Sequence, residues 1–329
     1  MDQNEYHYRK VIGSIGLSML FFLIFLTAFQ TVLTIASTVL SLIGTESPWA
    51  TVFYELLYGA GYLACFMTPV AILRKLIKRN QIPYLPMRTT IRFSKYALLA
   101  IPLGVSIVFS AAYVNMALID FFYIPDIMQV LAPSSEKLEA YEVILQFIVV
   151  CLVPGFCEEF LFRGAILTNC LPFGRSTAIL ISSLLFSLMH QNAQQFFYTF
   201  VAGIVLGVLY EMSGSIWPGV ILHTVNNFIS TAQGILPSDD AFLIELVIFF
   251  LGAISLVILL PRFFAKKKDL HDGVFGKTVE ASEAYAIVPL PAARQRKLFW
   301  RPTMTIFVII SISEALLAIL LVSIYGLLM

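Results

Sequence analysis

Charged side chains are scarce in this sequence. Asp, Glu, Lys and Arg make up 12% of its 329 residues, whereas 59% of the residues are hydrophobic. A soluble domain of this length needs many more charged groups to form a solvated surface. The composition therefore excludes a soluble globule and predicts an all-α protein that crosses a membrane several times.

Cysteine is also rare, and its pattern excludes a disulfide framework. The four cysteines lie in or at the ends of apolar runs without paired spacing: Cys65, Cys151, Cys157 and Cys170. Cys157 precedes two glutamates, and nearby negative charge disfavours the thiolate that a nucleophile needs. We expect all four to act as small apolar residues.

Long apolar runs, in contrast, recur along the whole chain. A helix needs about 20 apolar residues to cross a hydrocarbon core of about 30 Å. This criterion predicts a polytopic transmembrane helical bundle of about eight to nine spans. The candidate runs are residues 11–43, 49–73, 96–122, 143–168, 176–192, 194–212, 215–236, 241–261 and 303–328.

The basic residues predict the orientation of the chain. The first run lacks the small-residue cleavage site of a signal peptide, so it is expected to remain as a helix. If the N-terminus is placed on the cytoplasmic side, 20 of the 21 lysines and arginines fall on that side, and Lys137 alone falls on the external side. Cytoplasmic loops of membrane proteins are enriched in these residues. The sequence therefore predicts a cytoplasmic N-terminus and a C-terminus on the opposite face.

The stretch GFCEEFLFRG at 155–164 places three charges in the fourth apolar run. Ionisable groups inside a bilayer are costly unless they are paired or face a cavity, so they indicate function. Glu159 and Arg163 are four residues apart, which predicts an ion pair on one helix face. Glu158 is rotated by about 100° from its neighbour and is available for another task. The Pro-Gly pair at 154–155 is expected to loosen the helix there.

The fifth run carries the stretch FSLMHQN at 186–192, with His190 one turn after Phe186. If the fourth and fifth runs form a hairpin that turns near Pro172, Glu158 and His190 stand about 21 and 27 Å from the turn at about 1.5 Å per residue. Because these depths are similar, the two side chains are expected to meet.

The seventh run carries the stretch LHTVNNF at 222–228. His223 and Asn227 are four residues apart and share one helix face. Two polar side chains on one face of an apolar helix indicate a common partner. Asn226 is expected to face elsewhere and to form an interhelical hydrogen bond.

Each stretch alone also has an ordinary structural explanation: a helix contact, a hydrogen-bonded core histidine, or a polar pair between helices. Together the stretches supply one carboxylate, two imidazoles and one amide from three helices. Such a set can activate water and stabilise an oxyanion. The residues therefore point to hydrolysis, with helix packing as the alternative.

The three stretches resemble the motifs of a known family, the CAAX prenyl protease and bacteriocin-processing intramembrane endopeptidases, also called the CPBP, Abi or Rce1-type family. Its motifs are Glu-Glu-x-x-x-Arg, Phe-x-x-x-His and His-x-x-x-Asn on successive helices. Here they are present in order and unaltered as Glu158, Glu159 and Arg163, Phe186 and His190, and His223 and Asn227. The resemblance covers roughly residues 143–262.

The resemblance implies an intramembrane endopeptidase that hydrolyses a peptide bond with activated water. By this resemblance, Glu158 of the present chain would be the general base and His190 its partner, while His223 and Asn227 would bind the oxyanion. The remaining motif residues would support the site: Glu159, Arg163 and Phe186.

The resemblance leaves two cofactor states open. Glu158, His190 and His223 form a two-histidine, one-carboxylate set that could bind Zn²⁺ with a position left for water. No His-Glu-x-x-His pair is present, however, and a metal-free glutamate mechanism uses the same residues. We expect an enzyme without a cofactor, with zinc as the alternative.

Two other functions compete with the endopeptidase. A catalytically idle scaffold that regulates a partner protein is disfavoured by the intact motifs. A proton-coupled transporter is less favoured still, because inverted repeats and broken helices are not evident. The expected partners are the lipid bilayer and a membrane-associated peptide or protein substrate, without nucleic acid, and the expected location is a bacterial plasma membrane.

The resemblance also divides the chain into four segments. N-terminal transmembrane helices and an acidic external loop occupy residues 1–142, and the expected protease core occupies 143–262. A basic cytoplasmic loop follows at 263–302, and a C-terminal transmembrane helix at 303–329.

Overall fold

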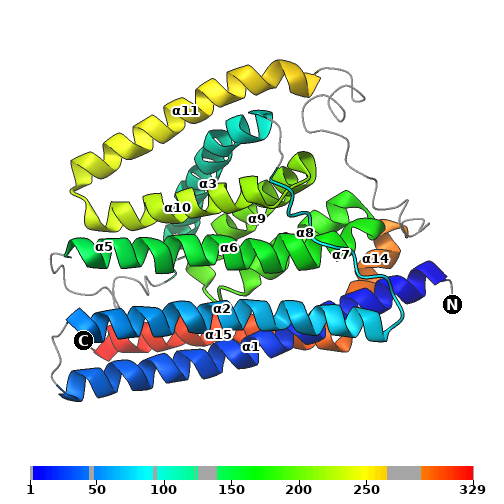
Figure 1. The fold of residues 1–329 in the computed structure, drawn as a ribbon, viewed down its shortest axis with the longest axis horizontal. Coiled ribbons are helices and arrows are strands. Elements are labelled where there is room, and N and C mark those ends of the chain that lie inside the picture. Colours follow the sequence, from blue (N-terminus) through cyan, green and yellow to red (C-terminus); the bar gives the residue numbers. More distant parts are fainter. Residues whose placement is uncertain are drawn as a thin grey trace.

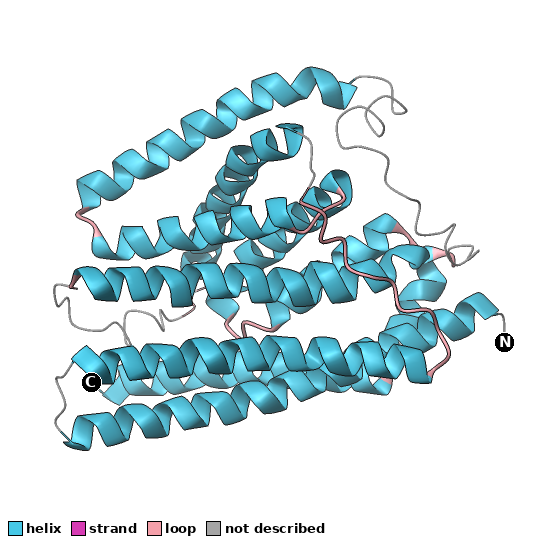
Figure 2. Cartoon of the chain, viewed as in Figure 1, coloured by secondary structure: helices cyan, strands magenta, loops and turns pink. Residues whose placement is uncertain are grey.

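The structure is a computed structural model, and it describes residues 3–43, 48–91, 95–122, 124, 139–264 and 290–328. Every regular element in these ranges is helical (Figure 2). The predicted all-α class is therefore confirmed. The predicted external loop lies largely outside the described residues, and so does most of the predicted basic loop.

The helices form three groups (Figure 1). One side of the bundle consists of α1 (Gln3–Ile43), α2 (Pro48–Arg79) and α15 (Pro302–Leu328), which pack along one another. The other side consists of α3 (Lys95–Phe121), α9 (Ala193–Ser213), α10 (Trp217–Ile235) and α11 (Ser238–Phe264). A helical rod from Ala140 to Cys170 lies between the two groups, so both sides can contribute to a site built on it.

This central rod is continuous and contains two π-helical segments. Its parts are α5 (Ala140–Gln146), the π-helix η1 (Phe147–Leu152), α6 (Val153–Glu159), the π-helix η2 (Phe160–Leu167) and α7 (Thr168–Cys170). Pro154 lies just after η1 inside the continuous rod, where its missing N–H removes one backbone hydrogen bond. The loosening that the sequence predicts near Pro154 takes the form of π-helical segments, which are often found at functional sites.

The hairpin predicted near Pro172 is present. A short 3₁₀ turn, η3 (Leu171–Phe173), ends the rod, and α8 (Arg175–Leu188) follows. Gly174 joins them with φ of 114°, a backbone conformation that favours glycine. The hairpin therefore places α8 alongside η2 and brings its C-terminal end toward the middle of the rod.

Seven of the described helical segments are long and apolar enough to cross a membrane, judged by length and composition. The other two predicted runs correspond to α8, which has only 14 residues, and to α10, which carries His223 and several other polar side chains. Fewer segments therefore meet the criterion than the sequence predicts, and the two that fall short carry candidate site residues.

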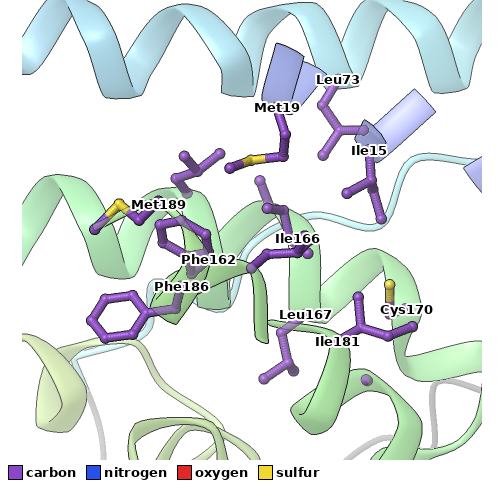
Figure 3. Packing of buried hydrophobic residues seen from close by; sticks show 14 of the residues in the cluster. Ile15, Met19, Leu73, Phe162, Ile166, Leu167, Cys170, Ile181, Phe186 and Met189 are labelled. Atoms are coloured by element: carbon purple, nitrogen blue, oxygen red, sulfur yellow. The ribbon is translucent and has the colours of Figure 1, made fainter. Parts of the chain in front are cut away.

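A buried apolar cluster fixes the hairpin against α1 and α2 (Figure 3). It joins side chains from both halves of the bundle: Ile15, Met19, Leu73, Phe162, Ile166 and Phe186. Inside a membrane such contacts stabilise through close van der Waals packing, since lipid tails are as apolar as these side chains. The cluster therefore holds Phe186, and with it the end of α8, in a defined position.

The ends of the bundle differ in charge. α1 and α15 begin, and α2 and α11 end, on the same side of the molecule (Figure 1). Basic residues gather at these helix ends: Arg9, Lys10, Lys78, Arg79, Arg262, Arg296, Lys297 and Arg301. The short helix α14 (Ala292–Phe299) also lies there, where Arg294 forms an ion pair of 2.7 Å with Glu5. We call this side the basic end.

Candidate active site

Glu158 and Glu159 form the last turn of α6, in the centre of the bundle. Their exposed fractions are 4% and 0%. An ionised carboxylate buried to this degree needs partners that replace its hydration. The neighbours of the two side chains therefore determine what each glutamate can do.

Glu159 forms the ion pair with Arg163 that the sequence predicts, with an N–O distance of 2.8 Å. Arg163 is fully buried, and its other terminal nitrogen donates to the carbonyl oxygen of Gly203 at 3.1 Å. Its guanidinium also lies over the ring of Phe186, 4.5 Å from the ring centre. The arginine thus ties the central rod to α8 and α9.

His223 on α10 contacts both glutamates. Its Nδ1 lies 3.1 Å from Oε1 of Glu159, and its Nε2 lies 3.7 Å from Oε2 of Glu158. Because a carboxylate accepts hydrogen bonds, Nδ1 is the donor to Glu159, and in the neutral ring Nε2 carries no proton. The 3.7 Å separation is too long for a direct hydrogen bond. One water oxygen can contact both atoms.

Tyr62 on α2 is the hydrogen-bond partner of Glu158. Its hydroxyl donates to Oε1 of Glu158, and its ring stacks between those of Tyr58 and Phe66. Oε2 of Glu158 has no hydrogen-bond partner among the described residues. The carboxylate is therefore held at one oxygen while the other remains available.

Tyr62 was not predicted from the sequence. It lies 96 residues before Glu158, and a tyrosine in an apolar helix is usually part of the packing. The signal that could have revealed it is the stripe of Tyr58, Tyr62 and Phe66 at four-residue spacing on one helix face.

His190 lies in the turn that follows α8. Its Nδ1 is 2.8 Å from the carbonyl oxygen of Phe186, so Nδ1 donates and Nε2 is left for another partner. The expected contact between His190 and Glu158 is not made through a hydrogen bond within the described part of the chain. Tyr62 occupies that role because α2 packs directly against α6.

Phe186 separates the two histidines. Its ring centre is 5.1 Å from that of His190 and 5.8 Å from that of His223, with edge-to-face geometry in both pairs. Such contacts stabilise by about 0.5–1.5 kcal/mol beyond burial. Phe186 therefore sets the relative positions of the two imidazoles, and the motif residues from three helices do come together.

A cavity of about 500 Å³ opens beside the histidines. His190, His223, Asn226 and Asn227 line it, together with apolar side chains from α3 and α9. Glu158 lies behind His223 and is not among the lining residues. A substrate in this cavity would contact the imidazoles and the amides directly.

The position predicted for Asn226 is wrong. It lines the cavity beside Asn227, and its Oδ1 is buried without a hydrogen-bond partner in the described ranges. Two consecutive helix residues point about 100° apart, but the cavity covers a broad face of α10 and therefore reaches both. The interhelical hydrogen bond that we expected for Asn226 is not formed by this oxygen within the described part of the chain.

Close approach of α10 to α6 depends on two glycines. A Cβ at Gly155 would lie 2.4 Å from Oγ1 of Thr224, and a Cβ at Gly219 would lie 3.0 Å from Oε2 of Glu159. Small residues at helix interfaces in membranes allow such backbone contact. The glycines therefore make the distances between His223 and the two glutamates attainable.

The alternative of a zinc site concerns the same three side chains. Among the described residues, no three His, Cys, Asp or Glu side chains are grouped so that they could hold a metal ion. The ring of Phe186 contacts both imidazoles, so a metal bound by Glu158, His190 and His223 together would require these side chains to move.

Comparison with known proteins gives a match that covers this site. Residues 140–229 match the family model described as "Type II CAAX prenyl endopeptidase Rce1-like". No curated protein and no solved structure matches the chain. The matched segment contains the three motifs, the hairpin and most of the cavity wall contributed by α9 and α10. This segment of the chain is therefore similar to the Rce1-like type II CAAX prenyl endopeptidases.

Proposed function

We propose that this chain is an endopeptidase that hydrolyses a peptide bond of a membrane-associated protein or peptide with water activated by Glu158. The geometry of Glu158 carries this proposal. Tyr62 holds one carboxylate oxygen, while the other faces Nε2 of His223 at 3.7 Å. A buried carboxylate with one oxygen available beside an imidazole is suited to general base catalysis.

In the proposed reaction, Glu158 removes a proton from a water molecule, and the water oxygen attacks the carbonyl carbon of the substrate. The negative charge on the former carbonyl oxygen is stabilised by the amide N–H of Asn227 and by His223 when it is protonated at Nε2. The carbon–nitrogen bond then breaks, and Glu158 returns its proton to the departing amine.

The remaining residues position these groups. Glu159 binds Nδ1 of His223 and so fixes the ring orientation, while Arg163 balances the charge of Glu159. His190 stands at the opposite edge of Phe186, where its Nε2 can accept a hydrogen bond from the substrate or the water. No step requires a metal ion.

Substitution of Glu158 tests the proposal. Glu158→Gln keeps the size and the hydrogen bond to Tyr62 but cannot accept a proton, so peptide cleavage should fall below detection while the thermal unfolding midpoint stays near the wild-type value. Arg163→Leu should lower both peptide cleavage and the thermal unfolding midpoint, because breaking a buried ion pair costs about 3–5 kcal/mol. Wild-type turnover by purified Glu158→Gln would exclude Glu158 as the base.

The cofactor state is tested separately. Activity is expected to survive incubation with a chelator followed by equilibrium dialysis, because the proposed steps use side chains alone. Metal content is measured on the same sample by elemental analysis. Stoichiometric zinc, with activity lost to the chelator and restored by zinc, would contradict the metal-free mechanism.

A further inference from the structure

A carboxylate that the proposed reaction does not use lies at the far end of the cavity. Glu245 on α11 lines the cavity together with Tyr113 on α3 and Gln233 on α10. The hydroxyl of Tyr113 donates to one oxygen of Glu245, and Nε2 of Gln233 donates to the other at 2.7 Å. These bonds hold the carboxylate in place on the cavity wall.

The distance along the cavity corresponds to a short peptide. Gln233 follows His223 by ten residues on the same helix, which is about 15 Å at about 1.5 Å per residue. An extended chain covers about 3.3 Å per residue. A substrate whose scissile bond lies beside His223 therefore places a residue about four or five positions away near Glu245.

The charge of the cavity wall is one-sided. Its described lining residues include no lysine and no arginine, and Glu245 is the carboxylate among them. His223, which the proposed reaction uses in its protonated form, lies about 15 Å away along α10 at about 1.5 Å per residue. A carboxylate moved from water to the Glu245 end therefore loses hydration and gains no lysine or arginine in exchange. A cation or an N–H donor finds the oxygens of Glu245 instead.

From this geometry, and resting on the proposed function, we propose that the cavity is a substrate subsite with Glu245 as its specificity-determining residue. It accepts a segment with a cationic or hydrogen-bond-donating group at the Glu245 end and rejects one with a carboxylate at that position.

The first test needs no variant. Matched apolar peptides are offered to the purified full-length protein. They differ only in a single lysine or glutamate, which is scanned over the five positions on either side of the scissile bond. Cleavage products are read by mass spectrometry. At one position the lysine peptide should be cleaved with a kcat/KM at least about tenfold above that of its glutamate counterpart, since like charges brought together are strongly disfavoured. Equal rates at every position, or faster cleavage of the glutamate peptides, would overturn the proposal.

The second test assigns the preference to Glu245. Glu245→Gln keeps the size and hydrogen-bonding capacity of the side chain, and the lysine-to-glutamate ratio should fall toward one. Asp239→Asn is the matched control, because it removes a negative charge from an exposed position on the same helix. The lysine-to-glutamate ratio of Asp239→Asn should remain that of the wild-type protein. A ratio that Glu245→Gln leaves unchanged would contradict the assignment.

Binding separates this inference from the proposed function. The same peptides are titrated against Glu158→Gln, and dissociation constants are measured by fluorescence anisotropy. A lysine preference in binding that disappears when Glu245→Gln is added supports the subsite even if no peptide is cleaved by the wild-type protein. If cleavage depends on Glu158 but neither rate nor binding shows a charge preference, the proposed endopeptidase function is retained and the Glu245 subsite is contradicted.

Discussion

At the scale of single residues, Tyr62 determines which oxygen of Glu158 is available. Its hydroxyl binds Oε1, so proton transfer must use Oε2, which faces His223. A hydrogen bond to a charged group contributes about 1.5–3 kcal/mol. Tyr62 therefore acts as a positioning residue that orients the base without contacting substrate.

Tyr62→Phe should lower kcat by about tenfold or more, because the loss of one hydrogen bond to a carboxylate releases its orientation. KM should change little, since Tyr62 does not line the substrate cavity. Steady-state kinetics measure both constants.

Tyr58→Phe is the matched control for this change. Tyr58 stacks on Tyr62 at 5.8 Å between ring centres, and removal of its hydroxyl leaves the bond to Glu158 in place. If both substitutions reduce kcat equally, packing of the aromatic stripe rather than the hydrogen bond is responsible.

The sequence could supply the residues of the site but not all of their contacts. The spacing of Glu159 and Arg163 sufficed for their ion pair, because the contact lies within one helix. The partner of Glu158 and the direction of Asn226 depend on how α2, α3 and α10 pack, which helical periodicity does not specify. For that reason Tyr62 was missed and Asn226 was misplaced.

At the scale of helices, the site depends on how closely α6 and α10 approach. Gly155 lies against Thr224, the residue next to His223. Any side chain at position 155 moves α10 outward and increases the separation between His223 and Glu158. The distance between these two groups is therefore set by a helix contact outside the motif residues.

Gly155→Ala should reduce cleavage and lower the free energy of unfolding by about 1–3 kcal/mol, because the added Cβ overlaps the side chain and the backbone of Thr224. Both effects are measured on the purified protein, by peptide cleavage and by thermal unfolding.

Gly234→Ala serves as the control on α10, since a Cβ there meets nothing within 4 Å. It should leave activity unchanged. Full activity of Gly155→Ala with wild-type stability would show that close packing of α6 and α10 is not required.

The sequence predicted the helical hairpin because Pro172 and the apolar runs on both sides of it are local signals. The two π-helical segments are different, since they depend on contacts that the rod makes with both sides of the bundle. α8 ends after 14 residues, shortly before Gln191, which has a φ of 52°, and Asn192, which caps α9.

At the scale of the whole molecule, the basic end defines an orientation. By the preference of cytoplasmic segments for Lys and Arg, the basic end should face the cytoplasm. The turn between α10 and α11, and with it the Glu245 end of the cavity, lies away from that side (Figure 1). The cavity should therefore extend toward the external half of the membrane.

Labelling with a membrane-impermeant maleimide tests this orientation. Trp49→Cys lies at the start of α2, and Ile91→Cys lies in the segment between α2 and α3, with exposed fractions of 80% and 74% for the native side chains. In intact cells Trp49→Cys should react, whereas Ile91→Cys should react only after permeabilisation.

The native chain is the control for labelling, because its four cysteines are all buried. The opposite pattern would place the basic end outside and would reverse the face toward which the cavity extends.

The shortness of α8 has a consequence for where the chain can turn inside the membrane. Its 14 residues correspond to about 21 Å, whereas a hydrocarbon core is about 30 Å thick. Backbone that leaves a helix at membrane depth is tolerated only where protein or a cavity surrounds it. Most side chains of α8 are buried against neighbouring helices, and His190, in the turn that follows, lines the cavity. The early end of α8 therefore places an imidazole at a depth that a full-length membrane helix would have passed.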